Sequence, residues 1–206
     1  MALSAKIKGA RAAALAVCLP LGILLAGCTP ATPVPAPTVE WSPSAPTGPY
    51  EDTDWVQAIR AYNLEWALAS NSHDLTSPAL AQVASSLDIS LLADRLRQSA
   101  EKGDFRFYPG PIPSEIIELT EDGDTARVRA CEPSTAWLIS KDHPEPSTDD
   151  ATEAVYNLVR AESGEIRVES TGGSDTPCDL SDAPVGLFDP QPDLTATYSA
   201  DDVKEP

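Results

Sequence analysis

Side chains that could carry out acid–base catalysis are few and widely spaced along this chain. Such chemistry needs an Asp, Glu or His whose pKa burial or a neighbouring charge brings near neutrality. The two histidines, His73 and His143, each stand beside an aspartate in polar sequence that is typical of a solvated loop. Asp104 begins a predicted strand, and Glu65 lies off the apolar face of a predicted helix. The sequence therefore identifies no catalytic residue.

Aromatic side chains are better candidates for a binding site. Trp55, Ile59, Tyr62 and Trp66 recur at helical spacing, so they share one face of a predicted helix. Such a face usually belongs to a hydrophobic core. It could instead line an apolar pocket in which Tyr62 supplies a polar group, with Trp137 as a further lining residue. The sequence leaves both interpretations open.

Motifs that bind metals or nucleotides are missing from the sequence. It contains no glycine-rich phosphate loop, no nucleophile elbow and no metal-binding helix motif. The segment "EDGD" at residues 121–124 is a turn too short for an EF-hand calcium loop. We therefore expect neither a metal nor a cofactor.

The charge balance is strongly acidic. The chain has 14 Lys and Arg against 32 Asp and Glu, a formal net charge of −18. A surface of this charge repels phosphate backbones, so we expect no binding to nucleic acid. Solubility alone explains such a composition, although it is also compatible with cationic partners.

The N-terminal segment has the organisation of an export signal. Basic residues at positions 6, 8 and 11 precede an apolar run over residues 12–25, which is shorter than the 20 or so residues that span a bilayer. The run ends in "LAGC", and Leu25-Ala26-Gly27-Cys28 is similar to the lipobox of bacterial lipoprotein precursors. An ordinary secretory signal with an incidental cysteine is the alternative.

The lipobox resemblance implies a processing route and a location. Residues 1–27 would be a signal peptide, cleaved between Gly27 and Cys28. Cys28 would carry fatty acyl chains such as palmitate, which hold the protein on the extracytoplasmic face of the cell membrane. The membrane is therefore the partner that the sequence predicts most directly.

Composition divides the remainder of the chain into three parts. Residues 28–50, rich in proline, predict a disordered linker after the lipidated cysteine. Residues 51–180 predict a folded domain, and the acidic residues 181–206 predict a disordered tail.

The folded domain is predicted to be α+β. Helical spacing and capping residues predict three helices, near residues 52–70, from residue 77, and over residues 88–102. Alternating apolar residues then predict four to five antiparallel strands. The strand candidates are residues 104–108, 115–120, 125–132, 151–160 and 166–170. Residues 135–140 either prolong the third of these strands or follow a break at Pro133.

This order of elements resembles the NTF2-like (cystatin-like cone) fold. The features that carry the resemblance are Trp55 and Trp66 on the first helix, the "EDGD" hairpin and the cysteine in the strand after it. The chain also looks like the NTF2-like lipoproteins and penicillin-binding-protein N-terminal domains of high-GC bacteria. The resemblance implies a curved antiparallel sheet that wraps around the first helix.

The expected function is non-catalytic presentation of this domain in the cell envelope, where it binds a protein partner or a small apolar ligand. An accessory role beside cell-wall enzymes is one form of this function. The alternative, implied by isomerase and cyclase relatives, is an enzyme with a carboxylate base in the cone pocket. An interior packed solid with Trp and Leu favours the first, and an open pocket with a buried carboxylate near Tyr62 favours the second.

The four cysteines have separate predicted fates. Cys18 would leave with the signal peptide and Cys28 would be acylated. Cys131 and Cys178 then remain as one pair in an oxidising compartment, and we predict a structural disulfide between them. A metal site or a redox pair is the alternative, but the sequence has no CxxC motif and its histidines lie in loop sequence.

Overall fold

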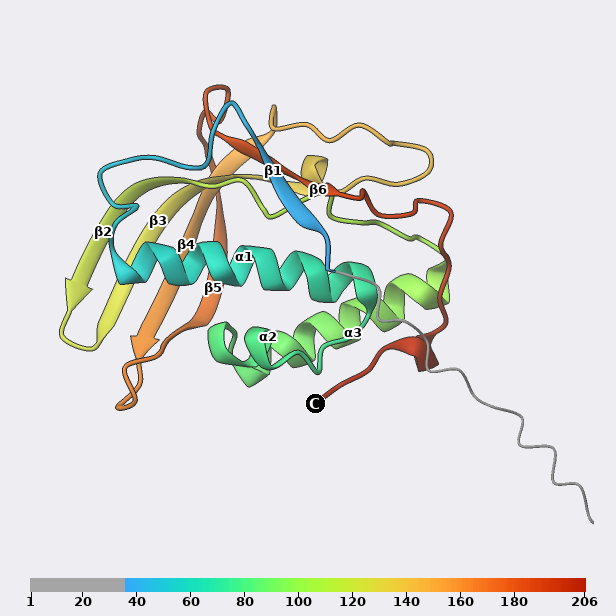
Figure 1. Cartoon of the computed structure of the whole chain (residues 1–206), viewed down its shortest axis with the longest axis horizontal. Coiled ribbons are helices and arrows are strands. Elements are labelled where there is room, and N and C mark those ends of the chain that lie inside the picture. The colour runs from blue at the N-terminus through green and yellow to red at the C-terminus, as the bar shows by residue number, and fades with distance from the viewer. Residues whose placement is uncertain (1–35) are drawn as a thin grey trace, which may run out of the picture. The chain divides into compact units, whose positions relative to one another are not determined.

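Three α-helices and two antiparallel β-sheets make up residues 36–206, the part of the chain that the computed structural model describes. These residues form one unit with its own core. The predicted signal peptide (residues 1–27) and lipidation site (Cys28) lie outside the described residues. The α+β class expected from the sequence is confirmed (Figure 1).

The helices begin and end where local sequence signals predict. They are α1 (Asp54–Ser72), α2 (Pro78–Val83) and α3 (Ser86–Lys102). The hydroxyl groups of Thr53 and Ser77 accept backbone N–H groups in the first turns of α1 and α2. Gly103 ends α3 in the left-handed conformation that glycine adopts most readily.

One antiparallel sheet of four strands follows the helices, in the order β2-β3-β4-β5. The strands are β2 (Glu115–Asp122), β3 (Thr125–Pro133), β4 (Ala151–Arg160) and β5 (Ile166–Pro177). The predicted "EDGD" hairpin joins β2 to β3, and Gly123 provides the positive φ of its turn. On β3, Ala126, Val128 and Ala130 are buried, as their alternation predicts.

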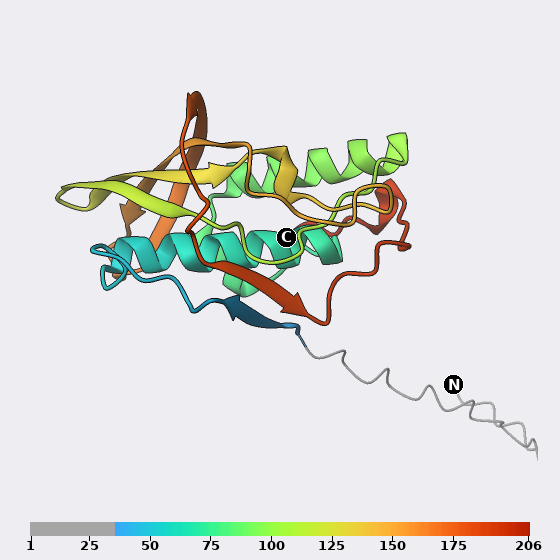
Figure 2. The same cartoon turned by 90° about the horizontal axis from the view of Figure 1, so that it is seen from above.

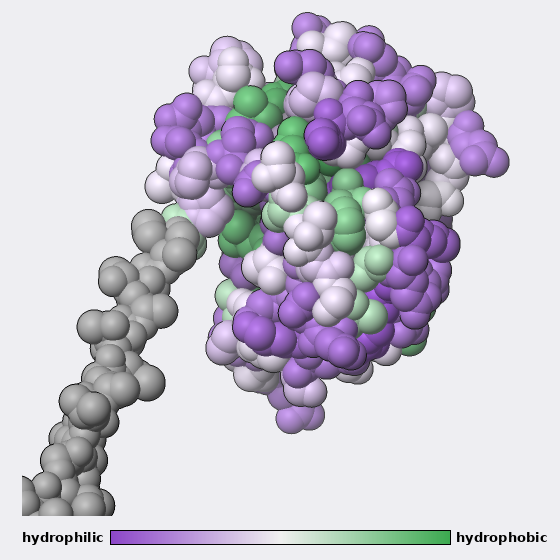
Figure 3. Space-filling view, turned by 90° about the vertical axis from the view of Figure 1, so that its right-hand side faces the viewer, coloured by the Kyte–Doolittle hydropathy of each residue, from purple (hydrophilic) through white to green (hydrophobic). Residues whose placement is uncertain are grey.

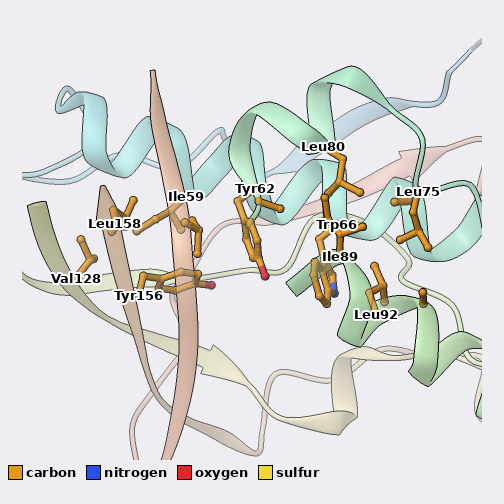
Figure 4. Packing of buried hydrophobic residues seen from close by; sticks show 14 of the residues in the cluster. Ile59, Tyr62, Trp66, Leu75, Leu80, Ile89, Leu92, Val128, Tyr156 and Leu158 are labelled. Carbon is orange, nitrogen blue, oxygen red and sulfur yellow. The ribbon is translucent and has the colours of Figure 1, made fainter. Parts of the chain in front are cut away.

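The main core lies between α1 and one face of this sheet. In Figure 4, Ile59 of α1 points toward Leu158 and Val128 of the sheet. Tyr62 and Trp66 continue the same face of α1 toward side chains of the α1–α2 connection, α2 and α3. The aromatic face of α1 is therefore largely core, one of the two interpretations that the sequence left open.

A second, two-stranded sheet was not predicted. β1 (Thr38–Ser42) pairs antiparallel with β6 (Val185–Asp189). Figure 2 shows α1 between this ribbon and the four-stranded sheet. The pairing is close because Gly186 has no Cβ, and one built there would lie 2.7 Å from Val39 and 2.9 Å from Trp41. Residues predicted as linker and tail thus form one ribbon.

The C-terminal residues are also part of the fold. Val203 is 8% exposed and belongs to the main core. The backbone of Lys204 donates to His73 and accepts from Leu75, both at 2.9 Å. The predicted domain of residues 51–180 is therefore too short at both ends, since tertiary pairing orders segments whose own composition gives no strand or helix signal.

One predicted strand is wrong, and one open alternative is decided. Residues 104–108 contribute only an isolated bridge, Phe107 with Ile139. Residues 135–140 do not prolong β3 but follow a break at Pro133, and they begin with a short 3-10 helix, Thr135–Trp137. Proline has no N–H for a sheet ladder, so β3 stops there.

The predicted disulfide between Cys131 and Cys178 is present, with 5.9 Å between the two Cα atoms. Cys131 is buried, and the pair packs with Ala151, Leu180 and Ala183 in a small second core. The bridge fixes the segment after β5 to the end of β3.

The surface is largely polar. Hydrophilic residues cover most of the face in Figure 3, with apolar residues gathered in a smaller group between them. On the exposed sheet surface, Arg129 pairs with Glu118 at 2.8 Å and Glu153 at 2.9 Å. None of the helices within residues 36–206 has the length and apolar character needed to cross a membrane.

Candidate functional site

The four aromatic pocket candidates do not gather in one place. Tyr62 and Trp66 stack with 5.4 Å between ring centroids. Trp55 lies at the other end of α1, where its indole N–H donates to Glu121 at 2.9 Å. Trp137 is buried apart from them and donates to the carbonyl of Gly110 at 3.3 Å. Only Tyr62 and Trp66 therefore remain together as candidates.

A carboxyl group that the sequence did not single out lies near these two rings. Glu132 follows Ala126, Val128 and Ala130 on the inward alternation of β3 and hydrogen-bonds to the hydroxyl of Tyr156. The ring of Tyr156 meets that of Tyr62 edge-on at 6.2 Å. Burial raises the pKa of Glu132 from 4.5 to about 7. A carboxyl with this pKa can both accept and donate a proton near neutrality.

The hydrogen-bond geometry is satisfied best when Glu132 is protonated. Tyr156 has one hydroxyl proton but two acceptors within reach, Glu132 and the side-chain oxygen of Asn63 at 3.1 Å. With a neutral Glu132, the acid donates to Tyr156 and Tyr156 donates to Asn63. With an ionised Glu132, the phenol turns to the carboxylate and Asn63 loses its donor. These hydrogen bonds lower the pKa of Glu132, and burial raises it by a larger amount.

A second carboxyl interacts with Tyr62. Asp88, in the first turn of α3, is 8% exposed and interacts with the Tyr62 hydroxyl. Burial raises its pKa, and its Oδ2 atom has no hydrogen-bond partner. Tyr62 thus neighbours two carboxyl groups whose pKa values are raised by burial.

Asn63 connects this interior to the outer face of α1. Its side-chain nitrogen donates to the carbonyl of Ile112 at 3.3 Å and to the hydroxyl of Ser114 at 3.4 Å. Arg60, one turn earlier, donates to the Ser114 carbonyl at 2.8 Å and forms an ion pair with Glu51. A continuous hydrogen-bonded chain therefore runs from Arg60 to the interior carboxyl.

A cavity of about 320 Å³ lies on that outer face, between α1 and β1; we call it the β1 groove. Val39 and Trp41 of β1 form one wall, and Ala61 and Leu64 of α1 form another. Its polar lining includes Arg60, Asn63 and Ser114, the first three residues of the hydrogen-bonded chain that leads to Glu132. The groove can hold a small molecule with an apolar body.

The ionisable residues considered from sequence do not join this site. His73 is buried at the C-terminal end of α1 against Tyr198, where burial lowers its pKa to about 4. His143 and Asp104 are exposed, and Glu65 accepts a hydrogen bond from Ser77. Within residues 36–206, no group of three His, Cys, Asp or Glu side chains is arranged to hold a metal ion.

Sequence reasoning missed Glu132 and Asp88 for different reasons. The alternation that placed Ala126 and Val128 inward also places Glu132 inward, so that signal was present. Asp88 was taken only as the start of the third helix, where acidic residues are common. The β1 groove could not be predicted, because one wall comes from a segment with the composition of a linker.

Comparisons with known proteins give little guidance. No protein-family model matches the chain, and no curated protein matches it. Among solved structures, one match is the solution NMR structure of a de novo designed β-sheet protein, 18% identical over 62% of this chain and 93% of the designed chain, with a TM-score of 0.30. A similarity of that size carries no argument about fold or function.

Proposed function

We propose that this chain is an extracytoplasmic lipoprotein, anchored through Cys28, whose NTF2-like domain binds a small apolar ligand without catalysing a reaction. The observation that carries the binding role is the β1 groove, an apolar cavity of about 320 Å³ lined by Val39, Trp41 and Leu64. A cavity of this size with a few convergent polar groups is typical of small-molecule sites.

The anchoring part of the proposal is supported by the N-terminal sequence. A basic segment, a short apolar run and "LAGC" occur in the order of a lipoprotein signal. Because β1 begins at Thr38, only residues 29–37 separate the proposed anchor from the fold. Nine residues span at most about 32 Å, so the domain would stay close to the bilayer surface.

The NTF2-like part of the proposal is supported by the arrangement of α1 and the sheet. A long helix with aromatic residues on its buried face covers one side of a four-stranded antiparallel sheet. Polar groups collect at one end of the space between them, around Tyr62 and Glu132.

Substitution of Cys28 tests the anchor. C28A should move the protein from the membrane fraction to the soluble fraction and abolish labelling by a radioactive or clickable fatty acid. C18A is the matched control, since Cys18 lies in the same N-terminal segment outside the lipobox, and it should change neither result. Unchanged membrane retention of C28A would refute anchoring through this residue.

Native mass spectrometry tests the binding role. Protein released gently from membranes should carry a noncovalent small molecule, which organic extraction should recover unchanged. Protein that carries no small molecule and binds no apolar probe would contradict the proposal.

A second candidate function is proton transfer, and Glu132 is the specific observation that favours it. Glu132 is a half-buried residue whose carboxyl has a pKa of about 7, raised by burial, and lies beside a phenol. The carboxylate form could take a proton from a carbon next to a carbonyl and return it to another carbon. NMR would detect deuterium uptake at that carbon of a β,γ-unsaturated ketone probe with the wild-type protein but not with E132Q. No uptake above the buffer rate would exclude this reaction for the probe.

A further inference from the structure

The walls and the polar lining of the β1 groove differ in chemistry, and the difference restricts its ligand. The walls are apolar and come from β1, α1 and the segment around Ile112. The one guanidinium in the groove, Arg60, is already paired with Glu51, and Nε lies 3.2 Å from its carboxylate. The site therefore offers no uncompensated positive charge to an anion.

The hydrogen-bonding groups in the lining are similarly engaged. Both Arg60 and Asn63 donate to Ser114, and Asn63 also donates to the Ile112 carbonyl. A ligand rich in hydroxyl groups would compete with these contacts for the same polar groups, and any hydroxyl group left unpaired on burial would cost free energy. A hydrocarbon chain gains from burial and needs no polar partner.

The volume of the groove sets the length of such a chain. A water-sized group occupies about 30 Å³, so 320 Å³ has room for about ten groups of that size. Burial of each methylene contributes to binding, so a chain of this length can bind without a charged headgroup contact.

We infer that the β1 groove holds the acyl chain of a free membrane lipid, about ten carbons of it. This inference rests on the proposed function, since the short connection from Cys28 to β1 is what brings Val39 and Trp41, which line the groove, near the bilayer. The domain would thus take up part of a lipid from the membrane to which it is attached.

A groove-filling substitution separates this ligand from nonspecific adsorption. A61W places an indole between the α1 and β1 walls and should weaken binding of 1-decanol, an uncharged ten-carbon probe, by at least tenfold, as measured by isothermal titration calorimetry. L87W is the matched control, because Leu87 is 64% exposed and does not line the groove, and it should bind the probe as the wild type does. A61M fills less space and should give an intermediate loss, which supports the interpretation if A61W proves unstable.

Cross-linking in membranes tests the source of the chain. The acylated protein in vesicles that contain a mid-chain diazirine phosphatidylcholine should cross-link at residues 39–41 and 61–64, and A61W should lose these products. Cross-links spread over the surface, or equal probe binding by the wild type and A61W, would overturn the inference. Probe binding by C28A but not by the acylated protein would also overturn it, because the groove would then hold the chain's own acyl group.

The same experiments keep the two proposals distinguishable. If C28A stays on membranes, the anchor proposal fails. The ligand assignment still stands if the wild-type protein binds the probe and A61W does not. If C28A is released but neither form binds the probe, anchoring stands and the ligand assignment fails.

Discussion

Replacing Glu132 with Gln should remove a pH dependence that this carboxyl contributes to stability. Its pKa rises from 4.5 in the unfolded chain to about 7 in the fold. Between these pH values the folded protein keeps a proton that the unfolded chain has released, so the free energy of unfolding falls as pH rises. One pKa unit corresponds to about 1.4 kcal/mol, so the loss reaches at most about 3 kcal/mol by pH 7 and then stays constant.

The wild-type curve alone will not show this effect clearly. The pKa of His73 falls from 6.5 to about 4, so its contribution rises with pH over that interval. The two slopes have opposite signs between pH 4.5 and 6.5 and largely cancel there. The difference between wild type and E132Q isolates the carboxyl, because His73 is the same in both proteins.

Urea titrations at pH 4, 5, 6, 7 and 8 provide the measurement. At pH 4 the two neutral side chains, protonated Glu132 and its Gln replacement, should give a small difference in unfolding free energy. By pH 8 that difference should have shifted in favour of E132Q by up to about 3 kcal/mol. E162Q is the matched control, since it also replaces a carboxylate with an amide but at an exposed position in the β4–β5 turn. A constant offset between wild type and E132Q across the range would refute the buried, proton-binding role of Glu132.

Three further predictions concern stability. H73N keeps a residue that tolerates the left-handed conformation of position 73. In the wild type, protonation of the unfolded chain at His73 lowers the free energy of unfolding by about 3 kcal/mol as pH falls from 6.5 to 4, and urea titration of H73N should no longer show this loss. C131S/C178S, which opens a loop with a sequence separation of 47, should cost about 4 kcal/mol, and no change in the urea midpoint would contradict a structural bridge. Deletion of residues 199–206 should cost about 2 kcal/mol through loss of Val203 burial, whereas an unchanged melting temperature would show that this segment does not support the core.

Local interactions explain what the sequence by itself determined. The three helices follow from helical spacing and from caps such as Thr53 and Gly103, which act within one turn. The hairpin at residues 121–124 follows from turn residues between alternating strands. The disulfide follows from counting cysteines once two others had predicted fates.

The tertiary structure alone decided the ends of the domain and the site. β1 has the composition of a linker, and it is ordered by β6, whose residues lie more than 140 positions later in the chain. The β1 groove exists only because that pairing holds Val39 and Trp41 over α1. The pKa of Glu132 depends on burial beside Tyr156, which belongs to another strand. Each of these properties arises from contacts between distant segments. The periodicity of β3 places Glu132 inward, but no single segment shows which groups it meets there.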